Sequence, residues 1–232
     1  MENTINGAKI QNDGVTYAIQ TTIPAGIVTP EDLERIARIG RKFSIPMIKM
    51  TSGQRFLLIG VQEKNIRSIR EELGTLGSGM ILPGVRYVQS CPGSTYCKNG
   101  TQDSLSLALS LSNRFQGRKF PAKLKIGVSG CPRCCGESKV RDIGIMGSQK
   151  GWTVYFGGNS GNRCRVGDMV ASCLQTERVL ELVDRLLVWF KSEAGEKETA
   201  ARFMERMESE PKLQEEFSKI KSEFAAPTCD LE

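Results

Sequence analysis

The sequence contains no histidine, and this absence excludes several kinds of chemistry. Without imidazole there is no Ser-His or Cys-His nucleophile pair. Zinc, copper and non-haem iron sites with histidine ligands are excluded as well. A metal in this chain must therefore be held by thiolate or carboxylate groups. A proton donor must be lysine, arginine, tyrosine, cysteine, a carboxylic acid or water.

Long apolar segments are also lacking. No run approaches the roughly 18 apolar residues that span a bilayer. The N-terminal stretch "MENTINGAKI" has neither the charged nor the apolar region of a signal peptide. We therefore expect a cytoplasmic protein with no membrane partner, in which thiols stay reduced. A hydrophobic content of 39% and a charged content of 25% are typical of a globular protein.

The charge is modestly basic, with a formal net charge of +6. This value is compatible with an ordinary basic surface. It is also compatible with an anionic substrate, an anionic cofactor or an acidic partner. No arginine-rich helix or RNA-binding motif is present, so we expect no nucleic-acid partner.

The first part of the chain alternates strand and helix patterns. "GVTYAIQTTI" predicts a strand, Thr29 and Pro30 predict the start of a helix, and Gly40 is expected to end it. Two strands, "IPMIKM" and "RFLLIGV", precede a second helix with Ile66 and Ile69 on its apolar face. This order predicts a ferredoxin-like α+β half-domain over residues 1–78.

A linker, "GSGMILPG", separates it from a second α+β domain predicted over residues 79–232. Here "VRYVQ" and "KLKIGV" are expected strands, with a helix over 101–115 between them. "DIGIMG" and "WTVYFGG" are expected strands around a turn. Residues 176–223 predict two or three amphipathic helices at the C-terminal end.

Five of the eight cysteines lie in two Gly/Pro-rich stretches, "SCPGSTYCKNG" and "SGCPRCCGES". Five residues separate Cys91 from Cys97, and three separate Cys131 from Cys135. Each pair follows an expected strand, so neighbouring strands can bring both loops to one sheet edge. Four soft thiolates suit an iron–sulfur cluster or zinc. The first pair is wide for a zinc knuckle, which favours a [4Fe–4S] cluster over zinc or reduced structural cysteines.

The other cysteines are given simpler interpretations. Cys134 is adjacent to Cys135, so it is the spare residue of the second stretch. Cys164 and Cys173 stand alone and are expected to be small buried hydrophobic residues. Cys229 lies near the C-terminal end.

With these motifs, the sequence resembles the sirohaem-binding nitrite and sulfite reductase family. A C-x5-C pair and a C-x3-C pair occur, each with proline after its first cysteine, together with "VRYVQSCPG", "FPAKLKIGVSGCP" and "VYFGGNSG". The likeness extends from about residue 15 to 200, including a "T-x-x-Q" turn at Thr51 to Gln54. Large members carry the two-domain unit twice, and this chain has it once. It therefore resembles the low-molecular-weight members.

The resemblance implies two cofactors and a reaction. Cys91, Cys97, Cys131 and Cys135 are expected to hold a [4Fe–4S] cluster, and Cys135 is also expected to be the axial ligand of the sirohaem iron. Thr51 and Gln54 stand on family positions that contact sirohaem. The reaction is multi-electron reduction of a small oxyanion, either sulfite to sulfide or nitrite to ammonia.

Cationic residues are expected around the substrate, because a bound oxyanion needs neutralising charge and protons. Arg86 matches a family anion-binding arginine, and Lys123 and Lys125 match its lysine pair. Their alternation also places both lysines on one face of a strand, although lysine on a strand is often simply solvated. The loop after "WTVYF" offers amides to anionic groups of the cofactor. Its residues are Gly157, Gly158, Asn159, Ser160 and Gly161. Further candidates are Lys49, Arg55 and Arg114.

Departures from the family pattern leave an alternative open. Gln20, Thr22 and Gly53 stand where reductases of this family usually carry arginine. A non-catalytic electron-transfer or cofactor-carrying protein is therefore the alternative to a reductase. No nucleotide-binding glycine loop is present, so electrons are expected from an external donor such as ferredoxin. We also expect a homodimer, because two copies related by a twofold axis would cover both faces of a wide macrocycle.

Overall fold

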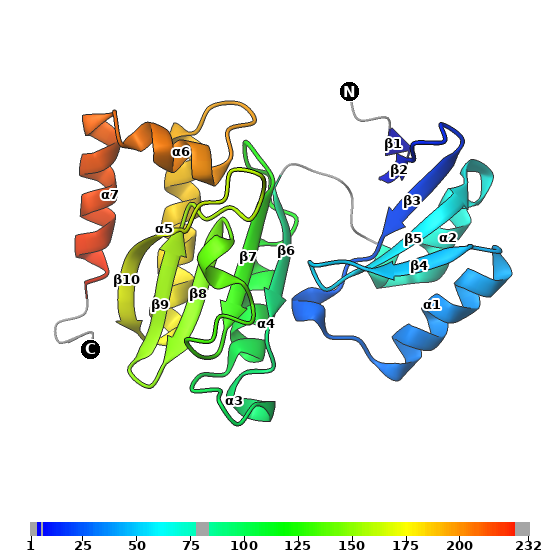
Figure 1. Ribbon diagram of the computed structural model, residues 1–232, viewed down its shortest axis with the longest axis horizontal. Coiled ribbons are helices and arrows are strands. Elements are labelled where there is room, and N and C mark those ends of the chain that lie inside the picture. The colour runs from blue at the N-terminus through cyan, green and yellow to red at the C-terminus, as the bar shows by residue number, and fades with distance from the viewer. Residues whose placement is uncertain (1–3, 6, 78–83, 226–232) are drawn as a thin grey trace. The chain divides into compact units, whose positions relative to one another are not determined.

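The computed structural model describes residues 4–5, 7–77 and 84–225. The chain divides into two compact units, Met1–Leu82 and Pro83–Glu232 (Figure 1). The predicted domain boundary between residues 78 and 79 lies outside the described residues, as does most of the predicted linker.

The first unit is a five-stranded antiparallel sheet in the order β1-β2-β3-β5-β4, with α1 and α2 packed on one face. The strands are β1 Thr4–Ile5, β2 Ala8–Ile10, β3 Thr16–Gln20, β4 Met47–Met50 and β5 Phe56–Gln62. The helices are η1 Pro24–Gly26, α1 Pro30–Lys42, η2 Glu63–Asn65, α2 Ile66–Leu73 and η3 Gly74–Gly77. The predicted strand and helix order is present, and the short strands β1 and β2 were not predicted.

Helix α1 begins as the sequence predicts and ends later. Thr29 and Asp32 form a capping box, in which each side chain accepts a hydrogen bond from the other's backbone N–H at 3.2 Å. The prediction that Gly40 ends the helix is wrong, because the helix continues to Lys42. A Cβ at Gly40 would lie 3.0 Å from Ile48 Cδ1, so the glycine leaves room for strand β4 rather than ending the helix.

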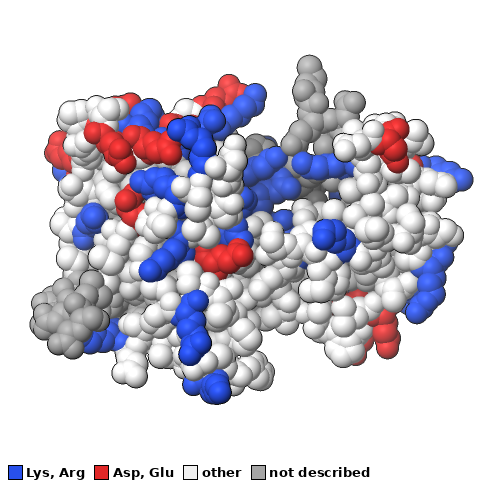
Figure 2. All heavy atoms as spheres, viewed as in Figure 1, with Lys and Arg blue, Asp and Glu red and all other residues white. Residues whose placement is uncertain are grey.

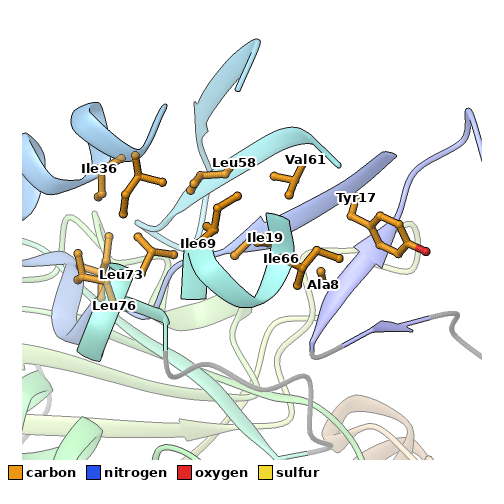
Figure 3. Close-up of a cluster of buried hydrophobic side chains, with 12 residues drawn as sticks. Ala8, Tyr17, Ile19, Ile36, Leu58, Val61, Ile66, Ile69, Leu73 and Leu76 are labelled. Atoms are coloured by element: carbon orange, nitrogen blue, oxygen red, sulfur yellow. The ribbon is translucent and has the colours of Figure 1, made fainter. Parts of the chain in front are cut away.

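The core of the first unit joins the two helices to the central strands (Figure 3). Ile36 from α1 and Ile69 and Leu73 from α2 face Ile19 and Leu58 from the sheet. All of them are buried. The apolar face predicted from helical spacing is therefore the face that packs against the sheet.

The second unit is a five-stranded mixed sheet in the order β10-β9-β8-β7-β6. Strands β6, β7 and β8 are parallel, and β8, β9 and β10 are antiparallel. Their bounds are β6 Val85–Ser90, β7 Leu124–Ser129, β8 Ile143–Ser148, β9 Gly151–Phe156 and β10 Asp168–Leu174. Helices α4 (Ser104–Phe115) and α5 (Thr176–Glu193) lie behind the sheet in Figure 1. The turn η4 (Ser138–Val140) and the loop after β9 lie in front of it.

The C-terminal helices α6 (Ala200–Met207) and α7 (Pro211–Glu223) complete this unit. They pack on α5 through aromatic side chains: the ring of Phe203 lies 4.8 Å from that of Trp189 and 5.4 Å from that of Phe190. The ring of Phe217 stacks on Trp189 at 5.6 Å. Among the described residues, no helix is both long and apolar enough to cross a membrane.

Candidate functional site

The two cysteine-bearing loops meet at the carboxyl edge of β6 and β7. These strands are parallel neighbours, so their loops leave the sheet side by side, as the sequence predicts. The Cys91 N–H donates a hydrogen bond to the Val128 carbonyl at 3.2 Å. The Gly130 N–H donates to Cys91 Sγ at 3.1 Å. The first loop also contains the helical turn α3 (Gly93–Tyr96) and ends at the Asp103 cap of α4.

Glycine allows the two loops to touch backbone to backbone. Within the first loop, a Cβ added at Gly100 would lie 2.4 Å from the Gly93 carbonyl carbon. A Cβ added at Gly130 would lie 2.8 Å from Gly93 Cα. The N–H groups of Thr101 and Gln102 both donate to the Gly130 carbonyl, at 2.8 and 3.0 Å. The loops thus form a close-fitting backbone surface, and the Gly130 amide already shows the N–H to sulfur bond that tunes thiolate clusters.

The predicted ligands differ in exposure within this surface. Cys131 is buried, Cys91 and Cys97 are half-buried, and Cys135 is exposed. Among the described residues, no group of three or more histidine, cysteine, aspartate or glutamate side chains is placed to hold one metal ion. A four-iron cluster needs no such group, because each cysteine bonds a different iron atom. Four thiols with backbone amides beside them are the kind of donor set that holds an iron–sulfur cluster.

The chain from Cys131 back to β8 crosses the front of the sheet, and its adjacent cysteines have different surroundings. Cys134 adopts a left-handed φ of 59° and is half-buried. Its Sγ accepts a hydrogen bond from the Lys139 N–H at 3.5 Å. Burial, together with the nearby Cys134 thiol, raises the pKa of Tyr155 on β9. Cys134 is thus directed to the sheet while Cys135 is exposed, which supports the interpretation of Cys134 as the spare residue.

The predicted anion-binding cations lie at the other end of the same strands. Arg86 and Lys125 are the second residues of β6 and β7, and both are half-buried. Strand β7 begins at Leu124, one residue later than predicted, so Lys123 precedes the strand and is exposed. Figure 2 shows Lys and Arg side chains spread over the front of this unit, where β7 to β9 lie in Figure 1. This face suits an anionic substrate or cofactor.

Asp142 is a buried carboxyl group beside these cations that the sequence analysis missed. Its Oδ2 accepts a hydrogen bond from the Lys125 N–H at 2.9 Å, an amide at the start of β7. Burial raises the pKa of Asp142 to about 6, although this hydrogen bond and the charges of Lys125 and Arg141 lower it. The only sequence signal was a single acidic residue before an apolar strand.

The loop after β9 lies on the backbone of residues 139–142. The Gly157 N–H donates to the Asp142 carbonyl at 2.8 Å, and Asn159 and Arg165 exchange two backbone hydrogen bonds of 2.8 Å. The Asn159 carboxamide oxygen accepts the Gly161 N–H at 3.0 Å, so three of the predicted amide donors, those of Gly157, Asn159 and Gly161, already have acceptors. The Ser160 hydroxyl accepts a hydrogen bond from Arg141 Nη1 at 2.9 Å. Arg141 was also missed, because one arginine between strands gives no sequence pattern.

Thr51 and Gln54 form the turn between β4 and β5 of the first unit. The Gln54 N–H donates to the Thr51 carbonyl at 3.0 Å, and Gln54 has a left-handed φ of 55°. A Cβ at Gly26 would lie 2.5 Å from Gln54 Oε1, so the Gly26 turn leaves space for this side chain. Gly53 is buried inside the turn, which gives a local reason for the absence of arginine there.

The isolated cysteines do not match their predicted roles. Cys164 is exposed rather than buried, because it lies in the loop between β9 and β10. Cys173 is half-buried and disulfide-bonded, so it is not a free hydrophobic residue. Cys229 lies outside the described residues.

The sequence of this chain matches two models of known protein families. Residues 82–221 match the nitrite and sulphite reductase 4Fe-4S domain, and residues 9–76 match the nitrite/sulfite reductase ferredoxin-like half domain. The class is an iron–sulfur oxidoreductase. The chain belongs to the nitrite and sulphite reductase family.

Curated relatives give the same result. An assimilatory-type sulfite reductase of Nitratidesulfovibrio vulgaris is 40% identical over 89% of this chain and 94% of its own length. A nitrite reductase [NAD(P)H] of Bacillus subtilis is 37% identical over 86% of this chain and 25% of its own length. The large subunit of an Escherichia coli nitrite reductase (NADH) is 35% identical over 87% of this chain and 24% of its own length. The chain therefore spans nearly all of the first relative and about a quarter of the other two.

A solved structure supports the fold. A dissimilatory sulfite reductase I has a TM-score of 0.74 at 14% identity, and the match covers 93% of this chain and 72% of that one. The prediction of an α+β protein with a ferredoxin-like half-domain is confirmed, and so is the prediction of a sulfite or nitrite reductase-type enzyme. The family's 4Fe-4S domain agrees with the predicted cluster. The relatives named here are all reductases, and no finding favours the non-catalytic alternative.

Proposed function

We propose that this chain is a small sulfite reductase, with nitrite as the second substrate of the same site. The structural observation that supports a reductase is the meeting of two cysteine loops at one sheet edge, with Arg86 and Lys125 at the starts of the same two strands. The choice of sulfite is supported by the similarity to an assimilatory-type sulfite reductase over 94% of that protein's length.

The cofactors of this proposal are a [4Fe–4S] cluster and sirohaem, which when bound would pass electrons from the external donor to the substrate. Cys91, Cys97, Cys131 and Cys135 would hold the cluster, and Cys135 would also be the residue that holds sirohaem. The exposure of Cys135 supports its role, because a shared ligand has to be reached by a large second group. Residues Thr51, Gln54 and Gly157 to Gly161 are the proposed contacts to the anionic groups of sirohaem.

The chain's own cations have two tasks in this proposal. Arg86, Lys123 and Lys125 offset the negative charge of the oxyanion and orient it by hydrogen bonds. The ammonium groups of Lys123 and Lys125 also pass protons to the oxygen atoms that leave as water. Each task becomes more effective away from bulk solvent, and the half-buried positions of Arg86 and Lys125 support this role.

The proposed partners are an external electron donor and a second copy of this chain. The net charge of +6 favours an acidic donor such as ferredoxin. Lys125 precedes Cys131 by six residues, and an extended strand of that length spans about 20 Å. One chain thus carries its cations and its cysteines at opposite ends of β7. A twofold dimer places the cations of one copy opposite Cys135 of the other. A cytoplasmic location stays a prediction.

An anaerobic absorption spectrum and a turnover assay test the enzyme. We expect sirohaem bands, a broad iron–sulfur shoulder, and sulfide formation from sulfite with a low-potential dye as donor. Sulfite should be consumed faster than nitrite. A colourless, zinc-containing protein would overturn the reductase, and faster ammonia formation from nitrite would reverse the order of substrates.

Substitution of the cations tests the substrate site. Arg86→Ala, Lys123→Ala and Lys125→Ala should each lower turnover by about tenfold or more, since removal of one preorganised charge typically costs ~2–4 kcal/mol. The sirohaem spectrum should stay unchanged. Lys150→Ala, in the exposed turn between β8 and β9, is the matched control and should keep full turnover. Unchanged turnover in all three cation variants would place the substrate elsewhere.

A further inference from the structure

Arg141 is a buried charged side chain just before β8, outside the residues assigned above to cofactor or substrate. Its side chain is 4% exposed. It forms an ion pair with Glu137 and donates a hydrogen bond from Nη1 to Ser160 Oγ at 2.9 Å. Burial of a guanidinium group is costly unless its partners are well placed. The two partners lie in different segments, one on each side of this arginine.

The Glu137 side of the contact leads to Cys135. Gln89 Nε2 on β6 donates to the Gly136 carbonyl at 2.8 Å and to Glu137 Oε2 at 3.3 Å. Gly136 directly follows Cys135, and its N–H donates to Ser129 Oγ at 2.9 Å. Glu137 itself has a left-handed φ of 54°, a conformation that a non-glycine residue keeps only when its surroundings hold it. The backbone that leaves Cys135 is therefore fixed to β6, β7 and Arg141.

The Ser160 side of the contact leads to the loop after β9. A Cβ at Gly158 would lie 2.5 Å from the Arg141 carbonyl oxygen, so this loop rests directly on the Arg141 backbone. The Gly157 N–H donates to the Asp142 carbonyl, and the Gly167 N–H to the Lys139 carbonyl, both at 2.8 Å. One arginine thus joins the segment of Cys135 to the loop from Gly157 to Gly161 through its two Nη atoms.

We propose that Arg141 is a positioning residue that holds Cys135 and the Gly157–Gly161 loop in one fixed arrangement. This inference rests on the proposed function, in which both segments hold sirohaem. Within the described chain, Arg141 Nε and Gln89 Oε1 are buried without a hydrogen-bond partner. Loss of Arg141 should displace both the Cys135 segment and the Gly157–Gly161 loop. The environment of the Cys135 thiolate should change as a result.

The holoenzyme provides the first test. Arg141→Met should shift the midpoint potential and the visible bands of the sirohaem while cluster iron stays near the wild-type content. Arg141→Lys should shift them less, because an ammonium group keeps the charge but not the fork that reaches both partners. Arg206→Met is the matched control: Arg206 is ion-paired to Glu198 and Glu210 among the C-terminal helices. It should lower the midpoint of urea unfolding without shifting the potential.

Variants of Glu137 and Ser160, the two side chains that Arg141 contacts, test the proposal even if Arg141→Met does not fold. Glu137→Gln removes the ion pair at an exposed residue outside the proposed sirohaem contacts. Ser160→Ala removes the hydrogen bond to Arg141 together with one proposed sirohaem contact. Each should shift the potential in the direction of the Arg141→Lys variant. An unchanged potential in the partner variants, or a loss of stability alone in Arg141→Met, would reduce Arg141 to a structural residue and overturn the proposal.

Amide hydrogen exchange in the apo chain separates this inference from the proposed function. If the wild-type protein takes up no sirohaem, the reductase proposal fails and the link between the segments is still measurable. Arg141→Met should raise the exchange rates of the Gly136 and Gly157 amides together, by roughly tenfold, as expected for loss of a charged hydrogen bond. Arg206→Met should leave both rates unchanged. A rise in only one segment, or in neither, would contradict the link.

Discussion

At the scale of single residues, the adjacent cysteines Cys134 and Cys135 show how local backbone assigns roles that composition does not. Both are thiols in the same Gly-rich stretch. The left-handed φ of 59° at Cys134 directs its sulfur to the Lys139 N–H. Cys135 is exposed. Cys135 is therefore the more exposed of the two adjacent thiols.

Single cysteine replacements test this assignment. Cys91→Ser, Cys97→Ser, Cys131→Ser and Cys135→Ser should each strip or severely deplete iron, because a hydroxyl is a poor ligand for an iron–sulfur cluster. Cys134→Ser is the matched control and should keep nearly all of its iron. Assays of iron and acid-labile sulfide measure the outcome. Iron loss from Cys134→Ser with retention in Cys135→Ser would show that the two roles are exchanged.

Asp142 predicts a pH dependence of stability. Its folded pKa of about 6 exceeds the ordinary aspartate pKa of 3.8, so the folded state binds the proton more tightly than the unfolded state. The stability that this group contributes is complete below pH ~4 and is lost as pH rises through ~6. Asp142→Asn keeps an acceptor for the Lys125 N–H without this ionisation.

Between pH ~4 and ~6 the wild type should therefore lose stability relative to Asp142→Asn. The free energy of unfolding of the variant, minus that of the wild type, should increase by on the order of 3 kcal/mol over this range. Urea unfolding at several pH values measures it. A constant difference across this range would mean that Asp142 ionises as readily in the folded as in the unfolded chain.

At the scale of secondary-structure elements, the C-terminal helices depend on aromatic packing. Phe203 on α6 is fully buried and meets Trp189 and Phe190 of α5 in edge-to-face contacts. Phe203→Ala should lower the free energy of unfolding by about 3–5 kcal/mol, through lost apolar contact and a residual cavity. Phe203→Leu should cost less, because it keeps part of the volume.

Tryptophan fluorescence reports the unfolding of the second unit, because both tryptophans, Trp152 and Trp189, lie in it. The urea transition should move to a lower concentration in Phe203→Ala, while iron content per folded protein stays the same. A transition equal to that of the wild type would show that α6 contributes little to the fold of this unit.

Strand β10 shows why some elements escape prediction from sequence. Its residues Asp168–Leu174 pair with β9 through two irregularities, so buried and exposed positions do not alternate. The short strands β1 and β2 lack enough residues to show any period. Strand β7 has a clear pattern, and its prediction is correct to within one residue at its start.

At the scale of the whole molecule, the separation of cations and cysteines on β7 motivates sites completed by two copies. Co-expression of Cys135→Ser with Lys123→Ala/Lys125→Ala tests it, because each variant alone lacks one half of every site. If sites form between copies, the heterodimer regains one working site, and turnover should exceed that of either variant expressed alone. A holoenzyme that stays monomeric in light scattering, with no recovery on co-expression, would contradict the dimer.

The sequence by itself determined the family and the general chemistry. The absence of histidine excluded most metal and nucleophile sites, and the spacing of Cys91, Cys97, Cys131 and Cys135 favoured a cluster. Apolar periods predicted α1, α2 and the central strands, because local propensity and burial agree in those segments. A capping pair such as Thr29 and Asp32 is similarly local and is visible in sequence.

Only the tertiary structure decided which residues act together. Arg141 joins Glu137 to Ser160, which are 23 residues apart, and Asp142 is buried against the start of β7. Such contacts depend on how strands pair and how loops cross the sheet, and no local period encodes them. The raised pKa of Asp142 and the different directions of Cys134 and Cys135 follow from burial and backbone conformation, which exist only once the chain has folded.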